Sequence, residues 1–410
     1  MIRILHTSDW HLGHSFGAVS REHEHRVFLD WLLDVLEERR VDALLVAGDV
    51  FDTSNPSARA QAQWYAFVAE ARRRLPRLRV VVIAGNHDSA GRLEAPGPLF
   101  DAFGVHAVGT LGGDGGFERV VVPLENAEGE VEAWALAVPF LRPADLPPGA
   151  GSPEEGVAEV YRRAVEAAAE RRAPGQGLVA LGHAYVRGGT VSEWSEHRIL
   201  GGNQHALPLE TFPEEIAYVA LGHLHRPQAP GGQERVRYSG APLPLDVSEA
   251  GYPSQVVLVE LEGDRLLGTE ALRAPRPVEI LRVPGDGAGP LDEVLDRLRA
   301  LEPLDGDPAD PLRPYLEVRV RLDRPDPGLR ARVDEALEGR AARLLRLSVE
   351  YTGTGEALAE AAPSRTLEEI TPEDVFRAAW ARSFEADPPP EMLAAFHELV
   401  DRVRHGEGAA

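Results

Sequence analysis

The sequence predicts an α/β protein whose largest domain is a sandwich of two β-sheets. Over residues 1–275, short apolar runs typical of buried strands alternate with amphipathic helical patterns. Several of these runs stop at a glycine, as central strands do when both faces of their sheet are covered. After residue 275 the pattern changes to a small α/β module and then to a helical tail. We therefore expect a two-sheet sandwich that carries a small capping domain and a C-terminal tail.

The elements expected in the first domain follow from the spacing of its apolar residues. Buried strands are expected at Ile2–Leu5, Ala43–Ala47, Val80–Ala84, Leu178–Leu181 and Tyr218–Leu221. Helices with an apolar stripe are expected at Arg26–Arg39, Ser57–Arg74 and Glu155–Arg172. A hairpin is expected from the strands Phe117–Leu124 and Val131–Val138, near a glycine-rich turn at residues 112–116. The closing strands are expected at Val236–Gly240 and Gln255–Glu262.

A second domain is predicted after the proline-rich boundary Pro275–Pro277. Residues 276–351 have the pattern of a βαβαβ module, whose elements are expected at Val278–Val283, Leu291–Leu298, Leu316–Leu322, Gly328–Glu338 and Leu344–Tyr351. We interpret residues 352–365 as a linker and residues 366–410 as a tail of two short amphipathic helices. These helices either expose a docking surface or fold back on the preceding domain, and the sequence favours neither arrangement.

Composition excludes several classes of chemistry. The formal net charge is −23, so affinity for nucleic acid has to come from local arginines, bound metal ions or a partner. The chain has no lysine, which excludes a P-loop and a Schiff-base mechanism, and no cysteine, which excludes disulfides and thiolate metal sites. There is no run of 18 apolar residues and no signal-peptide pattern, so we expect no membrane segment and a cytoplasmic location.

Polar side chains that can bind metal ions follow all five apolar runs. They are Asp9 and His11, then Asp49, then Asn86, His87 and Asp88, then His183, and last His223 and His225. A single ending of this kind is usually a turn or a cap. Five such endings, which all offer imidazole, carboxylate or amide groups, indicate one shared cleft that binds two metal ions and acts on phosphoesters.

The residue types at these endings suit two adjacent divalent ions. Ions about 3.5–4 Å apart need a bridging carboxylate, and Asp49 is the candidate. Asp9 and His11 can reach one ion from the same turn, whereas His223 and His225 can serve neighbouring ions from an extended segment. Mixed imidazole and carboxylate ligands suit manganese, iron or zinc better than calcium.

The other polar residues have distinct expected roles. The neutral ligands Asn86 and His183 leave positive charge on the site, which favours phosphate binding and an activated water. His87 is expected to protonate the leaving oxygen, with Asp88 orienting its ring. The alternative is that His87 is a metal ligand or a packing residue. His6, inside the first strand, is expected to be structural.

The five motifs in this order resemble the calcineurin-like metallophosphoesterases. The sequence around these motifs is similar to that of the nuclease subunits of bacterial SbcCD complexes, and this resemblance covers essentially the whole chain. The segments that carry it are Ile4–Gly13, Gly48–Asp52, Asn55–Ser57, Ala220–His225 and Tyr238–Pro242. Archaeal and eukaryotic relatives tend to carry a second histidine at the position of Asp52, whereas bacterial members share the carboxylate.

The resemblance implies a manganese site and several partners. Asp9, His11, Asp49 and His225 would hold one Mn²⁺, Asp49, Asn86, His183 and His223 would hold the other, and His87 would be the catalytic acid. The capping domain, residues 276–351, would contact DNA, and the tail would bind the coiled coil of an SbcC-type ATPase. Helices of the nuclease domain would form a homodimer, with Ser57–Arg74 as the candidate.

We therefore expect a manganese-dependent DNA nuclease that works in repair and recombination. Its expected activities are 3′-to-5′ exonuclease cleavage of duplex ends and endonuclease cleavage of single strands and hairpins. The alternative is a small-substrate metallophosphodiesterase or phosphatase, which the same ligands would serve but which has little need of residues 276–410. A scaffold with a vestigial metal site is a third hypothesis, and the complete ligand set argues against it.

Overall fold

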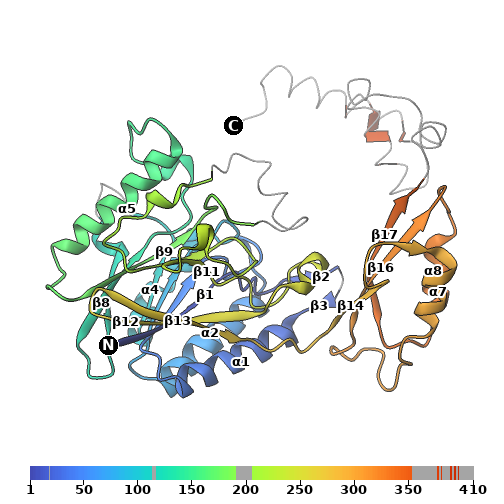
Figure 1. Ribbon diagram of the computed structural model, residues 1–410, viewed down its shortest axis with the longest axis horizontal. Helices are drawn as coiled ribbons and strands as arrows, with labels where there is room; N and C mark the ends of the chain where they lie inside the picture. The colour runs from blue at the N-terminus through green and yellow to red at the C-terminus, as the bar shows by residue number, and fades with distance from the viewer. Residues whose placement is uncertain are drawn as a thin grey trace.

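A computed structural model describes residues 1–17, 19–112, 117–190 and 206–352, together with isolated positions between residues 376 and 396 (Figure 1). All of the predicted linker except Thr352, and most of the predicted tail, lie outside these residues. No helix in the described ranges is long and apolar enough to cross a membrane.

The first sheet contains the N-terminal strand at its centre. Its order is β13 (Arg265–Arg273), β12 (Gln255–Glu262), β1 (Ile2–Thr7), β4 (Ala43–Ala47), β5 (Arg79–Ile83) and β6 (Val105–Val108). The strands β1, β4, β5 and β6 run parallel, and β12 and β13 add an antiparallel edge. The parallel strands are nearly continuous apolar runs because helices or the second sheet cover both of their faces.

Helices α1 (Glu22–Glu38) and α2 (Ala58–Arg74) pack on the outer face of this sheet. Their apolar residues recur every three or four positions, and this stripe includes Phe28, Leu32, Trp64 and Phe67. Helix α2 begins where predicted because the hydroxyl of Ser57 accepts a hydrogen bond from the Ala60 amide at 3.2 Å. Two short helices, α3 (Ala90–Glu94) and α4 (Gly97–Phe103), connect β5 to β6.

The second sheet has the order β11 (Val236–Tyr238), β10 (Tyr218–Gly222), β9 (Gly177–His183), β8 (Val131–Ala137) and β7 (Val121–Glu125). Strands β8 to β11 run parallel, and β7 and β8 form the predicted antiparallel hairpin. The expected strand over Phe117–Leu124 is wrong at its start, because Phe117–Val120 is a 3₁₀ turn. Phe117 and Val120 are both buried, and their three-residue spacing suits such a turn.

The two sheets enclose one core, and α5 (Pro153–Ala169) covers the outer face of the second sheet. Ile4, Leu45 and Val81 of the first sheet belong to the same buried cluster as Val179 and Val219 of the second. His6 also lies between the sheets, where its Nδ1 is 2.9 Å from the Tyr218 hydroxyl and its Nε2 is 3.2 Å from the Leu221 carbonyl oxygen. Its role is therefore structural, as the sequence indicated.

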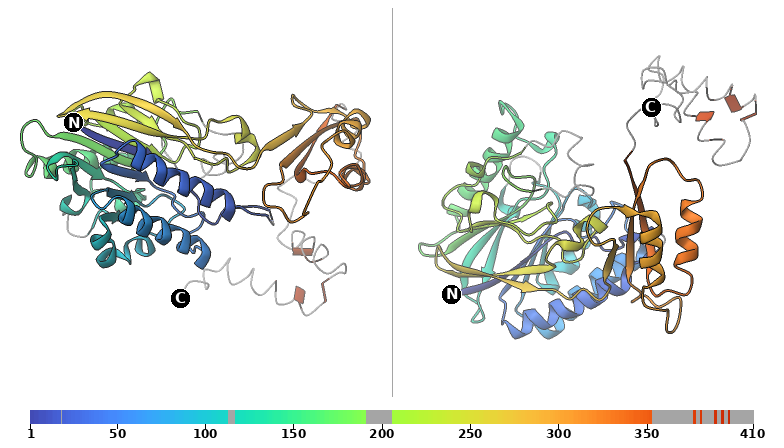
Figure 2. Two further views of the ribbon diagram at one scale, coloured as in Figure 1. Left: turned by 90° about the horizontal axis from the view of Figure 1, so that it is seen from below. Right: turned by 45° about the vertical axis from the view of Figure 1, so that its right-hand side comes forward.

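A third sheet has its own helices and its own core. It consists of β14 (Ile280–Val283), β15 (Gly289–Pro290), β16 (Tyr315–Leu322) and β17 (Arg343–Tyr351), all parallel, with α7 (Leu291–Arg299) and α8 (Leu329–Ala336) packed against it. This unit stands beside the end of the sandwich that carries the small hairpin β2 (Ser15–Phe16) and β3 (Val19–Ser20) (Figure 2). Phe16, Val278 and Tyr315 form a separate buried cluster between the two parts.

Candidate metal centre

The carboxyl ends of five parallel strands from both sheets meet at one place, and the residues that follow them have an unusual backbone. Asp9, His11, Asp49 and His223 have positive φ angles of 53°, 46°, 50° and 97°. Within the described ranges, the only other non-glycine residue with a positive φ is Arg40. Such backbone conformations cost free energy and concentrate at functional sites. Four predicted metal ligands are thus held in strained loops.

Glycines in the motifs let the loops of the two sheets approach one another closely. A Cβ atom on Gly48 would lie 2.3 Å from Nδ1 of His183, and one on Gly85 would lie 2.1 Å from an Asp49 carboxylate oxygen. A Cβ atom on Gly222 would lie 1.9 Å from the Ala47 carbonyl oxygen. These glycines are therefore required for the close approach of the ends of β4, β5, β9 and β10.

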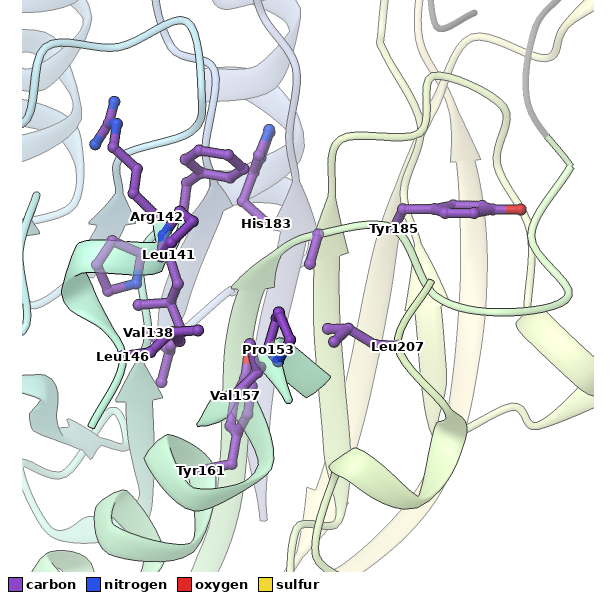
Figure 3. Close-up of a pocket in the computed structure, with 14 residues that line it drawn as sticks. Val138, Leu141, Arg142, Leu146, Pro153, Val157, Tyr161, His183, Tyr185 and Leu207 are labelled. Atoms are coloured by element: carbon purple, nitrogen blue, oxygen red, sulfur yellow. The ribbon is translucent and has the colours of Figure 1, made fainter. Parts of the chain in front are cut away.

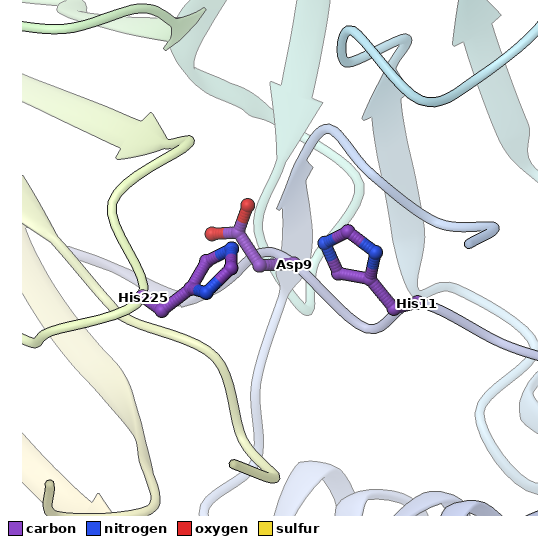
Figure 4. Close-up of side chains that lie close together, drawn as sticks. All are labelled: Asp9, His11 and His225. Carbon is purple, nitrogen blue, oxygen red and sulfur yellow. The ribbon is translucent and has the colours of Figure 1, made fainter. Parts of the chain in front are cut away.

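Asp9, His11 and His225 form one group of potential ligands (Figure 4). Each offers a donor atom, and these three atoms lie within 4.8 Å of one another. The Asp9 carboxylate is positioned by the Ser8 hydroxyl at 2.5 Å and by the His223 amide at 3.0 Å. Because β1 and β10 belong to different sheets, this group forms only when the sandwich is assembled.

The ring of His225 is oriented by an acidic residue that the sequence analysis missed. Glu249, which is buried, lies 2.8 Å from Nδ1 of His225 through its Oε1 atom. The other oxygen of Glu249 accepts the Leu245 amide at 2.8 Å, so the carboxylate is itself held in place. A carboxylate on the second ring nitrogen is typical of metal-binding histidines. No local motif reveals Glu249, because it is 24 positions from His225 and a 3₁₀ turn brings it there.

Asp49, Asn86, His183 and His223 form the second group. The side-chain oxygen of Asn86 is 3.0 Å from both His183 Nε2 and His223 Nδ1. A carboxylate oxygen of Asp49 is 3.3 Å from His183 Nε2. The other nitrogen of His183 lies 2.8 Å from the Ala47 carbonyl oxygen, which accepts its proton and leaves Nε2 facing Asp49 and Asn86.

The donor set fits a pair of divalent cations. Asp49 lies between the two groups, since its Oδ2 atom is 3.6 Å from His11 Nε2 and 3.3 Å from His183 Nε2. His11 Nε2 is buried and has no hydrogen-bond partner among the described residues. A buried ring nitrogen aimed at a carboxylate, within a cluster of imidazole, carboxylate and amide donors, is what a metal ion satisfies.

His87 and Asp88 lie at the same loop but do different things. Nδ1 of His87 is 2.8 Å from the Asp52 carbonyl oxygen, and its backbone amide donates to Asp49 at 2.8 Å. The carboxylate of Asp88 instead accepts the amides of Val50, Phe51 and Gly85 at 3.2, 2.9 and 2.9 Å. The expectation that Asp88 orients the His87 ring is therefore wrong: the ring contacts the Asp52 carbonyl oxygen, and Asp88 ties the two loops together through three backbone amides.

Electrostatics keep Asp49 and His223 in states that can bind a metal ion, whereas His183 holds a proton. Burial opposes the ionised forms of Asp49 and His183, but their mutual attraction outweighs burial: the pKa of Asp49 is lowered and that of His183 is raised to about 9. Burial, followed by the His183 charge, lowers the pKa of His223 to about 3, so its imidazole is neutral. Burial, followed by the Asp49 charge, raises the pKa of Asp88 to about 6. Asp49 thus presents a carboxylate, and a cation bound there would displace the proton of His183.

Two family profiles match the chain. The profile of the calcineurin-like phosphoesterases matches residues 2–227, more than half of the sequence, and it defines the class of the protein. A profile described as the type 5 capsule protein repressor C-terminal domain matches residues 275–384.

Curated relatives refine this class. A protein from Rhodobacter capsulatus, named as the D subunit of the nuclease SbcCD, is 45% identical in an alignment of 389 positions that covers 92% of this chain and 94% of that protein. Proteins of the same name from Escherichia coli K12 and Bacillus subtilis 168 are 35% and 36% identical over 293 and 264 residues. Those matches cover 68% and 63% of this chain, and 71% and 66% of those proteins. The chain therefore belongs to the calcineurin-like phosphoesterases and, within them, to the family of SbcD-type nuclease subunits.

Proposed function

We propose that the protein is a manganese-dependent DNA nuclease that cleaves phosphodiester bonds at the candidate metal centre. The observation that carries this proposal is the convergence of the seven predicted ligands from both sheets, four of them in strained backbone conformations. The names of its relatives call them nuclease subunits and thus support a nucleic acid as the substrate, for which we propose DNA. We further propose 3′-to-5′ exonuclease cleavage of duplex ends and endonuclease cleavage of single strands and hairpins.

Two metal ions, when bound, would supply an activated water and positive charge for the phosphate. Asp9, His11, Asp49 and His225 would hold one ion, and Asp49, Asn86, His183 and His223 would hold the other. Glu249 would fix the ring of His225, and the Ala47 carbonyl oxygen would fix that of His183. Asp88 would keep the loops of Asp49 and Asn86 at a constant separation through its three amide contacts.

His87 would transfer a proton to the leaving oxygen. The Asp52 carbonyl oxygen accepts the Nδ1 proton of His87, so Nε2 is the nitrogen that exchanges a proton with the substrate. Its ring centroid lies 4.8 Å from that of His11, which places it beside the ligands. The alternative that His87 itself binds a metal ion stays open, because His11, Asp52 and His87 also bring donor atoms within 4.8 Å of one another.

The remaining regions would serve macromolecular partners. We propose the domain division 1–275, 276–351, 352–365 and 366–410, with residues 276–351 as the unit that contacts DNA. The relatives are named as subunits of the SbcCD complex, which supports an SbcC-type ATPase as the partner of the tail. We also propose a homodimer formed through the exposed face of α2.

The test is hydrolysis by the purified full-length chain of labelled single-stranded, hairpin and blunt duplex DNA. We expect cleavage in Mn²⁺ and none in EDTA, with Asp49→Asn as the inactive reference. Hydrolysis of bis-p-nitrophenyl phosphate without cleavage of any DNA would favour the small-substrate phosphodiesterase instead. Absence of both activities in a protein that binds two metal equivalents would support the scaffold hypothesis.

A further inference from the structure

A cavity of about 210 Å³ lies next to the candidate metal centre, on the side of the second sheet. Four segments line it: the chain that follows β8, the first turns of α5, the end of β9 with the residues after it, and Leu207. Leu146, Val157 and Tyr161 gather around the space, with His183 above them (Figure 3). Most of the lining is apolar, and none of the proposed functions of the centre uses it.

The cavity and the candidate metal centre share a wall residue. His183 belongs to the cavity wall, and the ring of the same residue offers Nε2 to Asp49 and Asn86. The ring of Phe140, also in the wall, meets that of His183 edge-on with centroids 6.2 Å apart. The amide of Phe140 donates to the Ala84 carbonyl oxygen at 2.8 Å, two positions before Asn86. The cavity and the ligand loops are therefore built on the same backbone contacts.

The rim of the cavity carries a positive charge. The guanidinium group of Arg142 lies over the Phe140 ring, 5.6 Å from its centroid, and the Arg142 side chain is exposed. In contrast, the hydroxyl of Tyr161 is committed to the Leu181 carbonyl oxygen at 3.1 Å. The cavity thus has an apolar and aromatic interior and a cationic group at its rim. It offers few hydrogen-bonding groups that could distinguish one polar ring from another.

We propose that this cavity receives one unpaired nucleobase of the strand that is being cut, adjacent to the scissile phosphate. The inference rests on the proposed nuclease function. A phosphate held at the metal centre carries a sugar and a base on each side, and the shared residue His183 places the cavity within reach of one of these bases. A cavity of about 150 Å³ is sufficient to hold benzene, so this one has room for a nucleobase ring.

The chemistry of the wall matches a base that has left a duplex. Bases stack on aromatic and arginine side chains whatever their identity, because each base has a π-face. Phe140 and Arg142 supply such surfaces, and Arg142 also attracts the neighbouring phosphate. Because a base in a duplex is already stacked and paired, the cavity favours single strands and frayed ends over intact duplex, with little preference among sequences.

The test compares bonds within one molecule. A single-stranded oligonucleotide with one abasic residue in its middle is cut in Mn²⁺, and each product is resolved on a gel. We expect the full-length protein to cut a bond next to the abasic residue about tenfold more slowly than distant bonds, which is the order of one lost base stack. If every bond is cut equally, the nucleobase proposal is overturned while the nuclease function stands. If no bond is cut at all, the nuclease function itself fails.

Two variants assign the effect to the cavity. Val157→Phe fills the space from α5, and Leu146→Phe fills it from the chain before α5, so either should slow cleavage of normal strands and remove the extra effect of the abasic residue. Val165→Phe makes the same change two turns further along α5, at a similarly half-buried position outside the cavity, and should behave as the parent protein. Melting temperature and metal content verify that each variant is folded.

A second measurement does not depend on turnover. A strand that carries 2-aminopurine is mixed with the protein in Mn²⁺ and followed by stopped flow before the first cleavage. Stacking in the cavity should quench the fluorescence with the parent protein and with Val165→Phe, but not with Val157→Phe. Equal quenching by all three proteins would overturn the proposal.

Discussion

The hydroxyl of Tyr315 donates a hydrogen bond of 2.9 Å to the carboxylate of Glu24, which precedes it by 291 positions. This contact joins β16 of the third sheet to α1 of the sandwich, and both side chains are buried. Glu24 is also bound by Arg21 through contacts of 2.8 and 2.9 Å, and the Arg21 guanidinium lies 4.3 Å from the centroid of the Phe16 ring. The two parts of the protein therefore meet through a buried ion pair enclosed by aromatic rings.

Tyr315→Phe should weaken this junction. The substitution preserves the ring but leaves a buried carboxylate with one partner fewer, which costs about 1–3 kcal/mol. We expect a lower free energy of unfolding in urea and faster hydrogen exchange in β14 and β16. Tyr351→Phe is the matched control, because Tyr351 is exposed at the far end of β17, and it should change stability by less than about 0.5 kcal/mol. Equal stabilities of the two variants would contradict the importance of the Glu24 contact.

Asp49→Asn should remove both metal ions together. The amide keeps the size of the side chain and can still accept the His87 amide, but it loses the charge that faces His11 and His183. The metal content, measured by elemental analysis after gel filtration, should fall from two equivalents to none, and the rate of DNA cleavage should fall with it. Asp101→Asn is the same change at an exposed carboxylate on α4, away from the candidate metal centre, and it should keep both equivalents. One equivalent retained by Asp49→Asn would show that the bridge lies elsewhere.

His87→Gln should separate proton transfer from metal binding. General acid catalysis contributes about 10²–10⁴-fold, so DNA cleavage should fall by that factor while both metal equivalents remain. Hydrolysis of bis-p-nitrophenyl phosphate should fall much less, because p-nitrophenolate leaves without a proton. A parallel loss of metal and activity would instead make His87 a ligand.

The fold was predictable from sequence because its signals are local. Strand β4 is a continuous apolar run, and α2 is marked by the Ser57 cap and the apolar stripe of Trp64 and Phe67. Such patterns indicate whether one face or both faces of an element are buried, and they can be recognised without knowing which surface the element packs against. Phe117–Val120 was predicted to be a strand, and this was wrong because its apolar residues indicate burial but do not distinguish a strand from a 3₁₀ turn.

In the candidate site, only the residues that belong to short local sequence motifs were predictable. The seven candidate ligands follow apolar runs, and the carboxyl ends of neighbouring parallel strands meet at one edge of a sheet, so their convergence was predictable. Glu249 was not predicted because its contact with His225 depends on a 3₁₀ turn that lies 24 positions away in the sequence. Asp88 was assigned to its neighbour in sequence, His87, whereas folding brings it the amides of Val50 and Phe51 from another loop.

His6 should make the metal-free protein sensitive to acid. Burial lowers its pKa from 6.5 to about 3. Between these values the unfolded state binds one more proton than the folded state, so stability is lost as the pH falls through this window, by up to about 1.4 kcal/mol per pH unit. His6→Gln removes this titration, and urea unfolding in EDTA should then show a correspondingly shallower pH dependence between pH 6 and 4. An unchanged slope would mean that other groups govern the acid sensitivity.

The tail should be needed for the ATPase partner but not for the chemistry. Its large apolar residues include Phe376, Trp380, Leu393 and Phe396, and the rings of Phe376 and Phe396 stack with centroids 4.3 Å apart. Burying each side chain is worth about 1.5–3 kcal/mol, and short helices are marginal in water without a surface to pack on. Deleting residues 366–410 should therefore spare manganese-dependent cleavage of single strands, as measured by initial rates with a labelled oligonucleotide.

The same deletion should abolish co-purification with an SbcC-type ATPase and any ATP-stimulated cleavage of duplex ends. Trp380→Ala in the full-length chain is the finer test, because it keeps the backbone of the tail and removes one large side chain. We expect it to weaken binding of the ATPase in a titration by about tenfold or more, since about 1.4 kcal/mol of lost burial is a factor of ten in the dissociation constant. If the truncated protein binds the ATPase with unchanged affinity, the tail is part of the fold and the docking surface lies elsewhere.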